Sequence, residues 1–425
     1  MPFCLGVGLL CAIERPSVAG GGTRLLDVSL LACLGAVGAQ IVPLPVSARQ
    51  ALSPGSFEID RVLHFPIVNG PPVLALQTLS IDADSTAWAF ALALSYIGLF
   101  WCARQLFARG GIRMMARAVA WMGLALAAVA IVQHATAPDR LYWYWRPISA
   151  GATPYGPFVN RNSFATWLVM AIPLVVGYAL TRRQSRGLQA RGFAARLTTI
   201  DAVDLWLAAS ACLMMGGLLG SLSRAGIIGG AAGLVTFVWL SKIHVSKGHR
   251  IIGVAAALGA MIAIATMYAN MGALTVRMNR ALELGVAGRR AIWSDTWQMA
   301  GDFWLTGVGT GAYERGMLVY QQGSREFFYN HAHNEYLQML AEGGALLAVP
   351  VAVALVAGVR LVARRLRADR SPLFWLRAGA ASGIIAVAVQ SIWDTGLRVP
   401  ANDALFAVMA AIATYDAVRI DRSAT

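Results

Sequence analysis

The chain has 425 residues, of which 57% are hydrophobic and only 13% are charged. A soluble chain carries about a quarter charged residues, whereas this sequence repeats apolar runs of about 20 residues, the length that crosses a hydrocarbon core as a helix. Composition therefore predicts an all-α polytopic membrane protein. The formal charge of +14 does not indicate nucleic-acid binding, because most of the arginines lie in short links between apolar runs.

Ten apolar segments follow one another along the chain. They lie near residues 25–46, 86–107, 114–134, 164–181, 203–222, 225–240, 250–270, 336–359, 373–393 and 402–418. Residues 3–13 are apolar but short and lack a basic start, so they resemble a partial first span more than a signal peptide.

These segments predict about 10–12 spans in three parts. Residues 1–270 are expected to form an N-terminal bundle of about seven or eight spans. A large hydrophilic loop follows at residues 271–335, and three further spans occupy residues 336–425.

Basic residues gather in alternate links between the apolar segments. The basic stretches are residues 104–117, 182–202, 241–250, 360–372 and the C-terminal tail. By the positive-inside rule these links are cytoplasmic, so the long connections face the other side of the membrane. The long connections are residues 47–85, 135–163 and 271–335.

The densest polar chemistry is the stretch "YNHAHNEYLQMLAEGG", residues 329–344, directly before an apolar run. His331, His333 and Glu335 alternate, but on the helix that starts here steps of two residues turn side chains by about 200°. A shared metal is therefore disfavoured. The five cysteines lie inside apolar stretches without any CxxC spacing, so no disulfide framework or metal site is expected.

On the predicted helix, Asn334, Gln338 and Glu342 recur every four residues and form a polar stripe. A glutamate two turns into a span is costly unless it faces a cavity or a partner. Two interpretations follow: an interfacial helix end with polar groups that reach the surface, and a functional cleft. The cleft is favoured.

Two other stretches place arginines on the outward side. "SLSRAGIIGG", residues 221–230, joins two apolar runs almost without a link, so Arg224 lies at or below the outer membrane surface, where a charge usually has a function. "GRRAIW", residues 288–293, aligns Arg289 and Arg290, and guanidinium groups bind phosphate in a bidentate manner.

The connection at residues 135–163 ends in "GPFVNRNSF", which puts Asn160 and Arg161 at the mouth of the next span. Before them, residues 142–145 are four consecutive aromatic residues. This cluster is interpreted as an interfacial aromatic belt, with a carbohydrate platform as the alternative. In the last long loop, Gly307, Gly309 and Gly311 form a GxGxG pattern, which is weak as a nucleotide fingerprint because no strand precedes it.

Together these motifs resemble the O-antigen ligase and Wzy-type polymerase superfamily of bacterial membrane glycosyltransferases. Its signature is a histidine, then asparagine or serine, then nine residues, then glycine, and it is matched here by His333, Asn334 and Gly344. "SLSRAG", "GRRAIW" and "GPFVNRNSFA" are supporting matches. The resemblance extends over roughly residues 86–418, whereas the first 80 residues do not contribute to it.

The resemblance implies an inverting, metal-independent enzyme in the cell inner membrane with its active site at the periplasmic face. Its donor would be a glycan on undecaprenyl pyrophosphate, and its acceptor a hydroxyl of lipid A core or of a growing glycan. The residue types fit this chemistry: His333 is expected as the general base and Arg224 and Arg289 as ligands of the pyrophosphate. The expected substrate-binding residues are Asn334, Arg290, Arg161, Asn160, Gln338 and Glu342. No cofactor is expected.

A transporter or flippase of lipid-linked oligosaccharide is the alternative function. It predicts charges deep inside several spans and broken helices near the midplane, whereas the polar groups here cluster at the outer edge. The sequence does not separate ligase from polymerase, and it does not identify the sugar.

Overall fold

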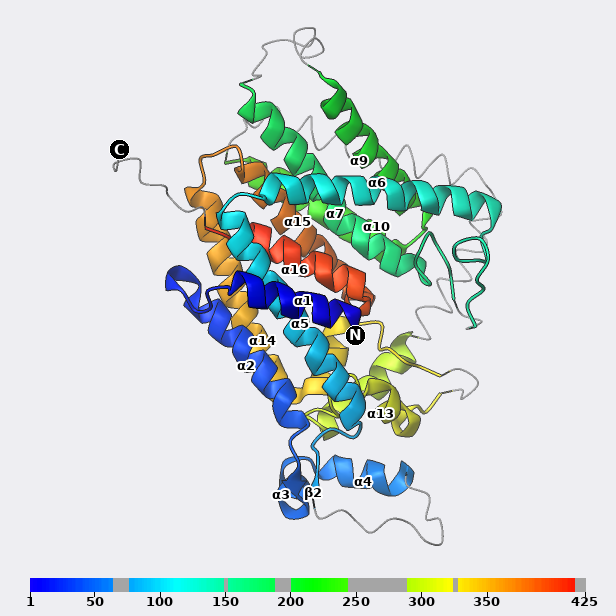
Figure 1. The fold of residues 1–425 in the computed structure, drawn as a ribbon. Helices are drawn as coiled ribbons and strands as arrows, with labels where there is room; N and C mark the ends of the chain where they lie inside the picture. The colour runs from blue at the N-terminus through cyan, green and yellow to red at the C-terminus, as the bar shows by residue number, and fades with distance from the viewer. Residues whose placement is uncertain (64–75, 149–151, 188–199, 244–288, 324–327, 417–425) are drawn as a thin grey trace. The chain divides into compact units, whose positions relative to one another are not determined.

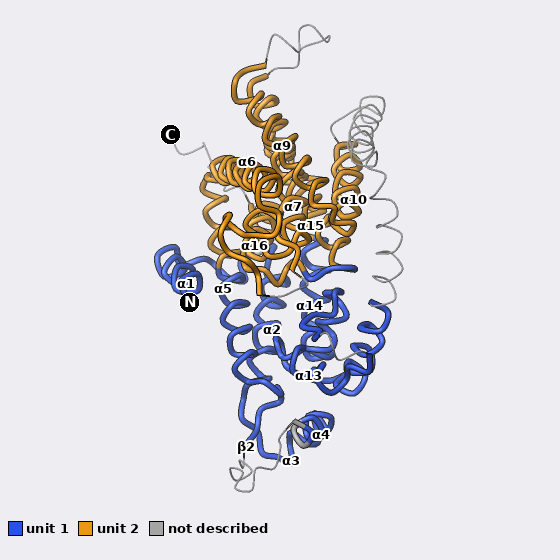
Figure 2. The backbone as a smooth tube through the Cα atoms, turned by 90° about the vertical axis from the view of Figure 1, so that its right-hand side faces the viewer, with its two compact units in different colours: residues 1–98, 273–360, 392–395 blue, residues 99–272, 361–391, 396–425 orange. Residues whose placement is uncertain are grey.

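The computed structural model describes residues 1–63, 76–148, 152–187, 200–243, 289–323 and 328–416. The described chain is mostly helical with almost no sheet, and its helices include several that are long and apolar enough to cross a membrane, so the predicted all-α polytopic membrane fold is confirmed. The chain divides into two compact units, which Figure 2 colours separately.

Unit 1 comprises residues 1–98, 273–360 and 392–395, and unit 2 comprises the rest. The helices that begin in unit 1 are α1 (Pro2–Glu14), α2 (Arg24–Gln40), α3 (Val46–Leu52), α4 (Pro54–Leu63), α5 (Ala83–Ala108), α13 (Tyr313–Tyr320) and α14 (Glu335–Ala368). A two-residue antiparallel pairing joins β1 (Leu44–Pro45) to β2 (Leu76–Gln77). Figure 1 shows α5 and α14, and by residue number each begins in unit 1 and continues into unit 2.

The other helices of unit 2 are α6 (Ile112–Thr136), α7 (Arg161–Ser185), α9 (Ala202–Gly220), α10 (Arg224–Ser241), α15 (Phe374–Gln390) and α16 (Pro400–Thr414). Two short 3-10 turns complete the described elements, η1 (Gly21–Thr23) and η2 (Gly396–Arg398).

Six of the described helices have the length and hydropathy of a membrane span: α5, α6, α7, α9, α10 and α14. α1, α15 and α16 are apolar but shorter. The predicted span at 250–270 lies outside the described residues. The predicted segment at 25–46 is too long, because its helix ends at Gln40 and the "VPLP" that follows contains two prolines, which cannot donate helix hydrogen bonds.

Unit 2 is built around α7, which is the most deeply buried of the candidate spans. Small residues allow its neighbours to approach closely. In α10, for example, a Cβ on Gly229 would lie 2.6 Å from the carbonyl oxygen of Ala386 in α15. The glycines of "SLSRAGIIGG" thus include one at a close helix crossing.

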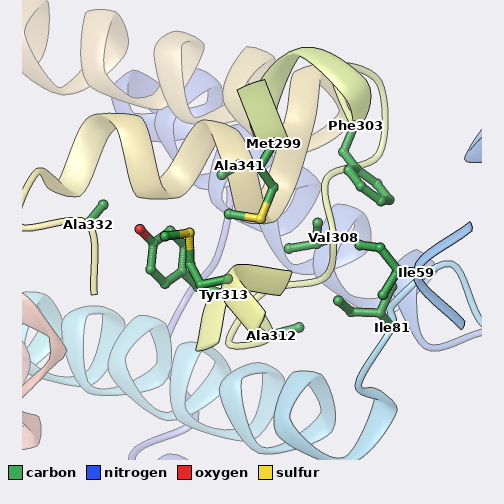
Figure 3. Close-up of a cluster of buried hydrophobic side chains, with 10 residues drawn as sticks. Ile59, Ile81, Met299, Phe303, Val308, Ala312, Tyr313, Ala332 and Ala341 are labelled. Atoms are coloured by element: carbon green, nitrogen blue, oxygen red, sulfur yellow. The ribbon is translucent and has the colours of Figure 1, made fainter. Parts of the chain in front are cut away.

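Unit 1 contains a second hydrophobic core beneath the segment at residues 289–342. Met299, Phe303, Val308 and Tyr313 are buried there, together with Ile59 and Ile81 from the N-terminal part of the chain (Figure 3). Burial of large apolar side chains stabilises this segment by about 1.5–3 kcal/mol per residue. The first 80 residues are therefore part of the scaffold that holds the segment before α14.

α14 is interrupted at Gly344, nine residues after its first residue, Glu335. Gly344 has φ 54° and ψ −160°, which is not helical. The two backbone N–H groups that follow the break are hydrogen-bonded to a loop that precedes α14 in the sequence. The Ala345 N–H donates to the Trp304 carbonyl at 2.7 Å, and the Leu346 N–H donates to the Leu305 carbonyl at 2.9 Å. The short helix at the start of α14 and the long helix after the break are thus separately anchored.

Candidate functional site

His333 lies immediately before α14, and its neighbour Asn334 starts the helix. Asn334 Oδ1 accepts from the Leu337 N–H at 3.0 Å, and the Asn334 carbonyl accepts from the Gln338 N–H at 3.0 Å. This is helix N-capping, for which asparagine and serine are both preferred. The capping role explains physically why the signature accepts either residue after the histidine.

The His333 side chain is half-buried, and its Nδ1 is buried with no hydrogen-bond partner among the described residues. Burial lowers the pKa of His333, and the positive charge of Arg289 lowers it further. The imidazole is therefore neutral near pH 7, and a neutral imidazole can accept a proton. An unpartnered buried ring nitrogen is also a position that a substrate hydroxyl can satisfy.

Arg289 and Arg290 lie on helical residues 289–302, in the same unit as His333. Arg289 is half-buried and Arg290 is exposed. On the same helix, Trp293 donates its indole N–H to the Ala332 carbonyl at 2.9 Å. The helix that carries the arginine pair is thereby hydrogen-bonded to the residue just before His333.

Gln338 and Glu342 are both only 1% exposed and bond to one another. Gln338 Nε2 donates to Glu342 Oε1 at 3.0 Å, while Gln338 Oε1 accepts from the Ala332 N–H at 2.9 Å. His331 Nδ1 lies 3.5 Å from Gln338 Nε2. The polar stripe predicted from the sequence is therefore a buried network that reaches the peptide preceding His333.

The glycine of the signature, Gly344, lies where a side chain would overlap the neighbouring backbone. A Cβ on Gly344 would lie 2.6 Å from the backbone nitrogen of Gly307, and a Cβ on Gly307 would lie 2.1 Å from the carbonyl oxygen of Glu342. The Val308 and Gly309 N–H groups also donate to the Ala341 and Glu342 carbonyls. In the described structure the GxGxG stretch thus packs against the break in α14.

Gln40, at the end of α2, is a residue of this region that the sequence analysis missed. It is 1% exposed, and its Nε2 donates to the carbonyls of Thr306 and Glu342 at 2.8 and 2.9 Å. Its Oε1 accepts from the backbone N–H and the hydroxyl of Thr310. A glutamine at the end of an apolar run was the available signal, but its partners lie more than 260 residues away.

Unit 2 contains the other predicted site residues. Arg161 and Arg224 are the first residues of α7 and α10, and their positive charges are close enough to repel one another. Within the described part of the chain neither side chain forms an ion pair. Two unneutralised arginines at helix N-termini, which are themselves electropositive, form an arrangement that attracts an anion.

Each of these helix starts is capped by the residue before the arginine. Asn160 Oδ1 accepts from the Asn162 N–H at 2.8 Å, and Ser223 Oγ accepts from the Gly226 N–H at 3.2 Å. The Arg161 N–H donates to the Thr153 carbonyl at 2.9 Å. The caps fix the backbone at the two arginines and leave their side chains for other partners.

The aromatic residues Tyr142, Trp143, Tyr144 and Trp145 also lie in unit 2 and are between 42% and 77% exposed. Their exposure is compatible with the interfacial belt and with the carbohydrate platform. Among the residues that the structure describes, no three histidine, cysteine, aspartate or glutamate side chains gather into a group suited to a metal ion.

Residues 209–352 match the family model described as O-antigen ligase. The matched stretch contains Arg224, Arg289, Arg290, His333, Asn334, Gln338 and Glu342, and it ends just after Gly344. Asn160 and Arg161 precede it. The comparison with curated proteins yields no match.

Proposed function

We propose that this chain, whose residues 209–352 match the family model described as O-antigen ligase, is a membrane glycosyltransferase of surface-polysaccharide assembly in the O-antigen ligase and polymerase superfamily. Its donor is a glycan on undecaprenyl pyrophosphate, and its acceptor is a hydroxyl of lipid A core or of a growing glycan. The main support for the proposal is the environment of His333. Burial and the nearby positive charge of Arg289 both lower the pKa of this histidine, which keeps it neutral.

In the proposed reaction the acceptor hydroxyl transfers its proton to His333 while its oxygen forms a bond to the anomeric carbon of the donor sugar. The bond from this carbon to the pyrophosphate oxygen breaks, and undecaprenyl pyrophosphate leaves with the bonding electron pair. Attack from the face opposite the leaving group inverts the configuration. Arg289 stabilises the negative charge of the leaving pyrophosphate, so no metal ion is required.

Three further arginines and two asparagines among the predicted residues bind the donor in this scheme. Arg290 is exposed and adds positive charge beside Arg289, and Arg161 and Arg224 supply a second pair of guanidinium groups for phosphate. Asn160 and Asn334 use their side-chain oxygens to cap helices. Their amide nitrogens remain as donors to sugar hydroxyl groups.

The site is proposed to face the periplasm from the inner membrane. The argument is the arginine asymmetry of the links, which puts the basic stretches on the opposite side. The location of His333 directly before a candidate membrane helix supports this. A lipid-linked pyrophosphate lies at the membrane surface, so a catalytic group must lie there too.

The direct test uses the purified full-length protein with undecaprenyl-pyrophosphate-linked glycan. Lipid A core and a second lipid-linked repeat are offered in separate reactions. His333→Ala should lower transfer by about 10²–10⁴-fold, while His331→Ala, the matched control two residues earlier, should retain most of it. Product on lipid A core identifies a ligase, and a ladder of lengthening chains identifies a polymerase.

The arginine assignment is tested in the same assay. Arg224→Lys and Arg289→Lys should stay impaired with either acceptor, although less than the alanine variants, because lysine lacks the planar fork that matches two phosphate oxygens. Near-normal transfer by His333→Ala at normal accumulation would remove the base assignment. A protein that uses neither acceptor but moves the donor between leaflets would establish the flippase instead.

A further inference from the structure

The backbone of His333 is in a conformation that histidine rarely adopts. Its φ is 51°, in the left-handed region, where a residue with a side chain is strained. Such a conformation persists when the surrounding structure fixes it. The neighbours of His333 on both sides therefore need to be rigid.

Ala332, on the N-terminal side, has both of its backbone groups bonded by side chains. Its N–H donates to Gln338 Oε1 and its carbonyl accepts from Trp293 Nε1, each at 2.9 Å. The two side chains come from two different helices, and Ala332 itself is fully buried. The peptides on both sides of Ala332 thus have little freedom to rotate.

Asn334, on the C-terminal side, is fixed as the cap of α14. Gln338 is fixed in turn, because its Nε2 donates to Glu342 Oε1 and the side chain is 1% exposed. His333 therefore lies between two neighbours whose backbones are fixed by hydrogen bonds, and its left-handed φ sets the direction of the imidazole.

We propose that Trp293 and Gln338 are positioning residues, which hold Ala332 so that His333 keeps the left-handed conformation required for it to act as the base. This inference rests on the proposed function of His333. Because the Gln338 amide is buried and bonded at both ends, it acts through the Ala332 peptide and not by contact with the glycan. Trp293 acts through the other side of the same residue.

The test compares Trp293→Phe and Gln338→Met with the wild-type protein, all at full length. Phenylalanine keeps an aromatic ring without the N–H, and methionine keeps the length without the amide. We expect kcat to fall about 10–100-fold, as expected for a displaced catalytic group, with KM for the donor changed less than about twofold. Trp297→Phe is the matched control, one turn away on the same helix and 66% exposed, and should leave kcat unchanged.

A second comparison separates positioning from general damage to the fold. In a His333→Ala background, Trp293→Phe and Gln338→Met should lower the residual rate by less than about twofold, because the group they position is gone. Equal losses with and without His333, or a change confined to KM, would overturn the proposal.

A third readout does not depend on glycan transfer. NMR titration of histidine-labelled protein in nanodiscs, with the His333 signal assigned by its loss in His333→Asn, measures the pKa of that imidazole. The wild-type pKa should lie below 6.5, and both variants should raise it as the ring leaves its buried position. An unchanged pKa would overturn the positioning role. Absence of transfer by the wild-type protein with either acceptor would instead overturn the proposed function and leave this result intact.

Discussion

Replacing Gly344 with alanine should separate the start of α14 from the loop that anchors it. Gly344 combines φ 54° with ψ −160°, a region that is nearly restricted to glycine. The added Cβ would lie 2.6 Å from the Gly307 nitrogen and 2.7 Å from the Leu305 carbonyl oxygen. Both are backbone atoms, so no side-chain rotation can relieve the overlap.

The expected loss follows from these two effects. The backbone conformation costs on the order of 1–3 kcal/mol for a residue with a Cβ, and overpacking a tight contact costs about 1–3 kcal/mol. Together they predict that the free energy of unfolding falls by about 2–6 kcal/mol. Unfolding of the purified protein by SDS in mixed micelles, followed by far-UV circular dichroism, measures this difference.

Gly358→Ala is the matched control on the same helix. There the new Cβ would meet its nearest neighbour, Leu26 Cδ1, at 3.9 Å, which is ordinary contact. Alanine also favours a helix over glycine by about 0.5–1 kcal/mol, so this variant should be as stable as the wild type or slightly more stable. A loss below about 1 kcal/mol for Gly344→Ala, or an equal loss for Gly358→Ala, would refute the steric argument.

Two further predictions concern protonation and orientation. Burial and Arg289 lower the folded pKa of His333 below its ordinary value of 6.5. The contribution of this group to stability is therefore present above pH 6.5 and is lost as the pH falls through the folded pKa. The activity of the base should be lost over the same range. Arg289→Gln removes a positive charge that lowers this pKa, so the pKa should rise and the acid limb of the kcat/KM profile should move to higher pH. An acid limb at the same pH as in the wild type would contradict this prediction. For the orientation, Gly301→Cys and Ser185→Cys are made in a background without native cysteines and treated with an impermeant thiol reagent from the periplasmic side. Only the cysteine at residue 301 should react. Reaction at residue 185 and not at residue 301 would reverse the proposed topology.

The apolar patterning of this chain was sufficient to predict the described helices that are long enough to cross a membrane. The described spans lie where hydropathy puts them, because a backbone in lipid must satisfy its hydrogen bonds within each segment. Two ends differ most from the predicted segments: α14 continues to Ala368, nine residues past residue 359, and α2 ends at Gln40, six residues before residue 46. There two prolines stop the helix within an apolar run, and the residue at that end, Gln40, has partners far away in the sequence.

The sequence predicted the residue types of the candidate site, and the structure adds the contacts of those that it describes. The four-residue spacing of Asn334, Gln338 and Glu342 correctly indicated one polar stripe, since side chains four apart are neighbours on a helix. The same spacing says nothing about what faces the stripe. In the structure the stripe bonds to the Ala332 peptide and to itself, and these bonds support the positioning role proposed for Gln338.

Composition and periodicity act locally along the chain, so they were sufficient to predict the all-α membrane fold and the segment in which the polar groups gather. The left-handed backbone of His333, the fit of Gly307 against Gly344, and the bond from Trp293 to Ala332 became apparent only in the folded chain. These depend on hydrogen bonds and close contacts between residues about 40 positions apart. Such contacts form when separate helices pack together, and no local pattern specifies them.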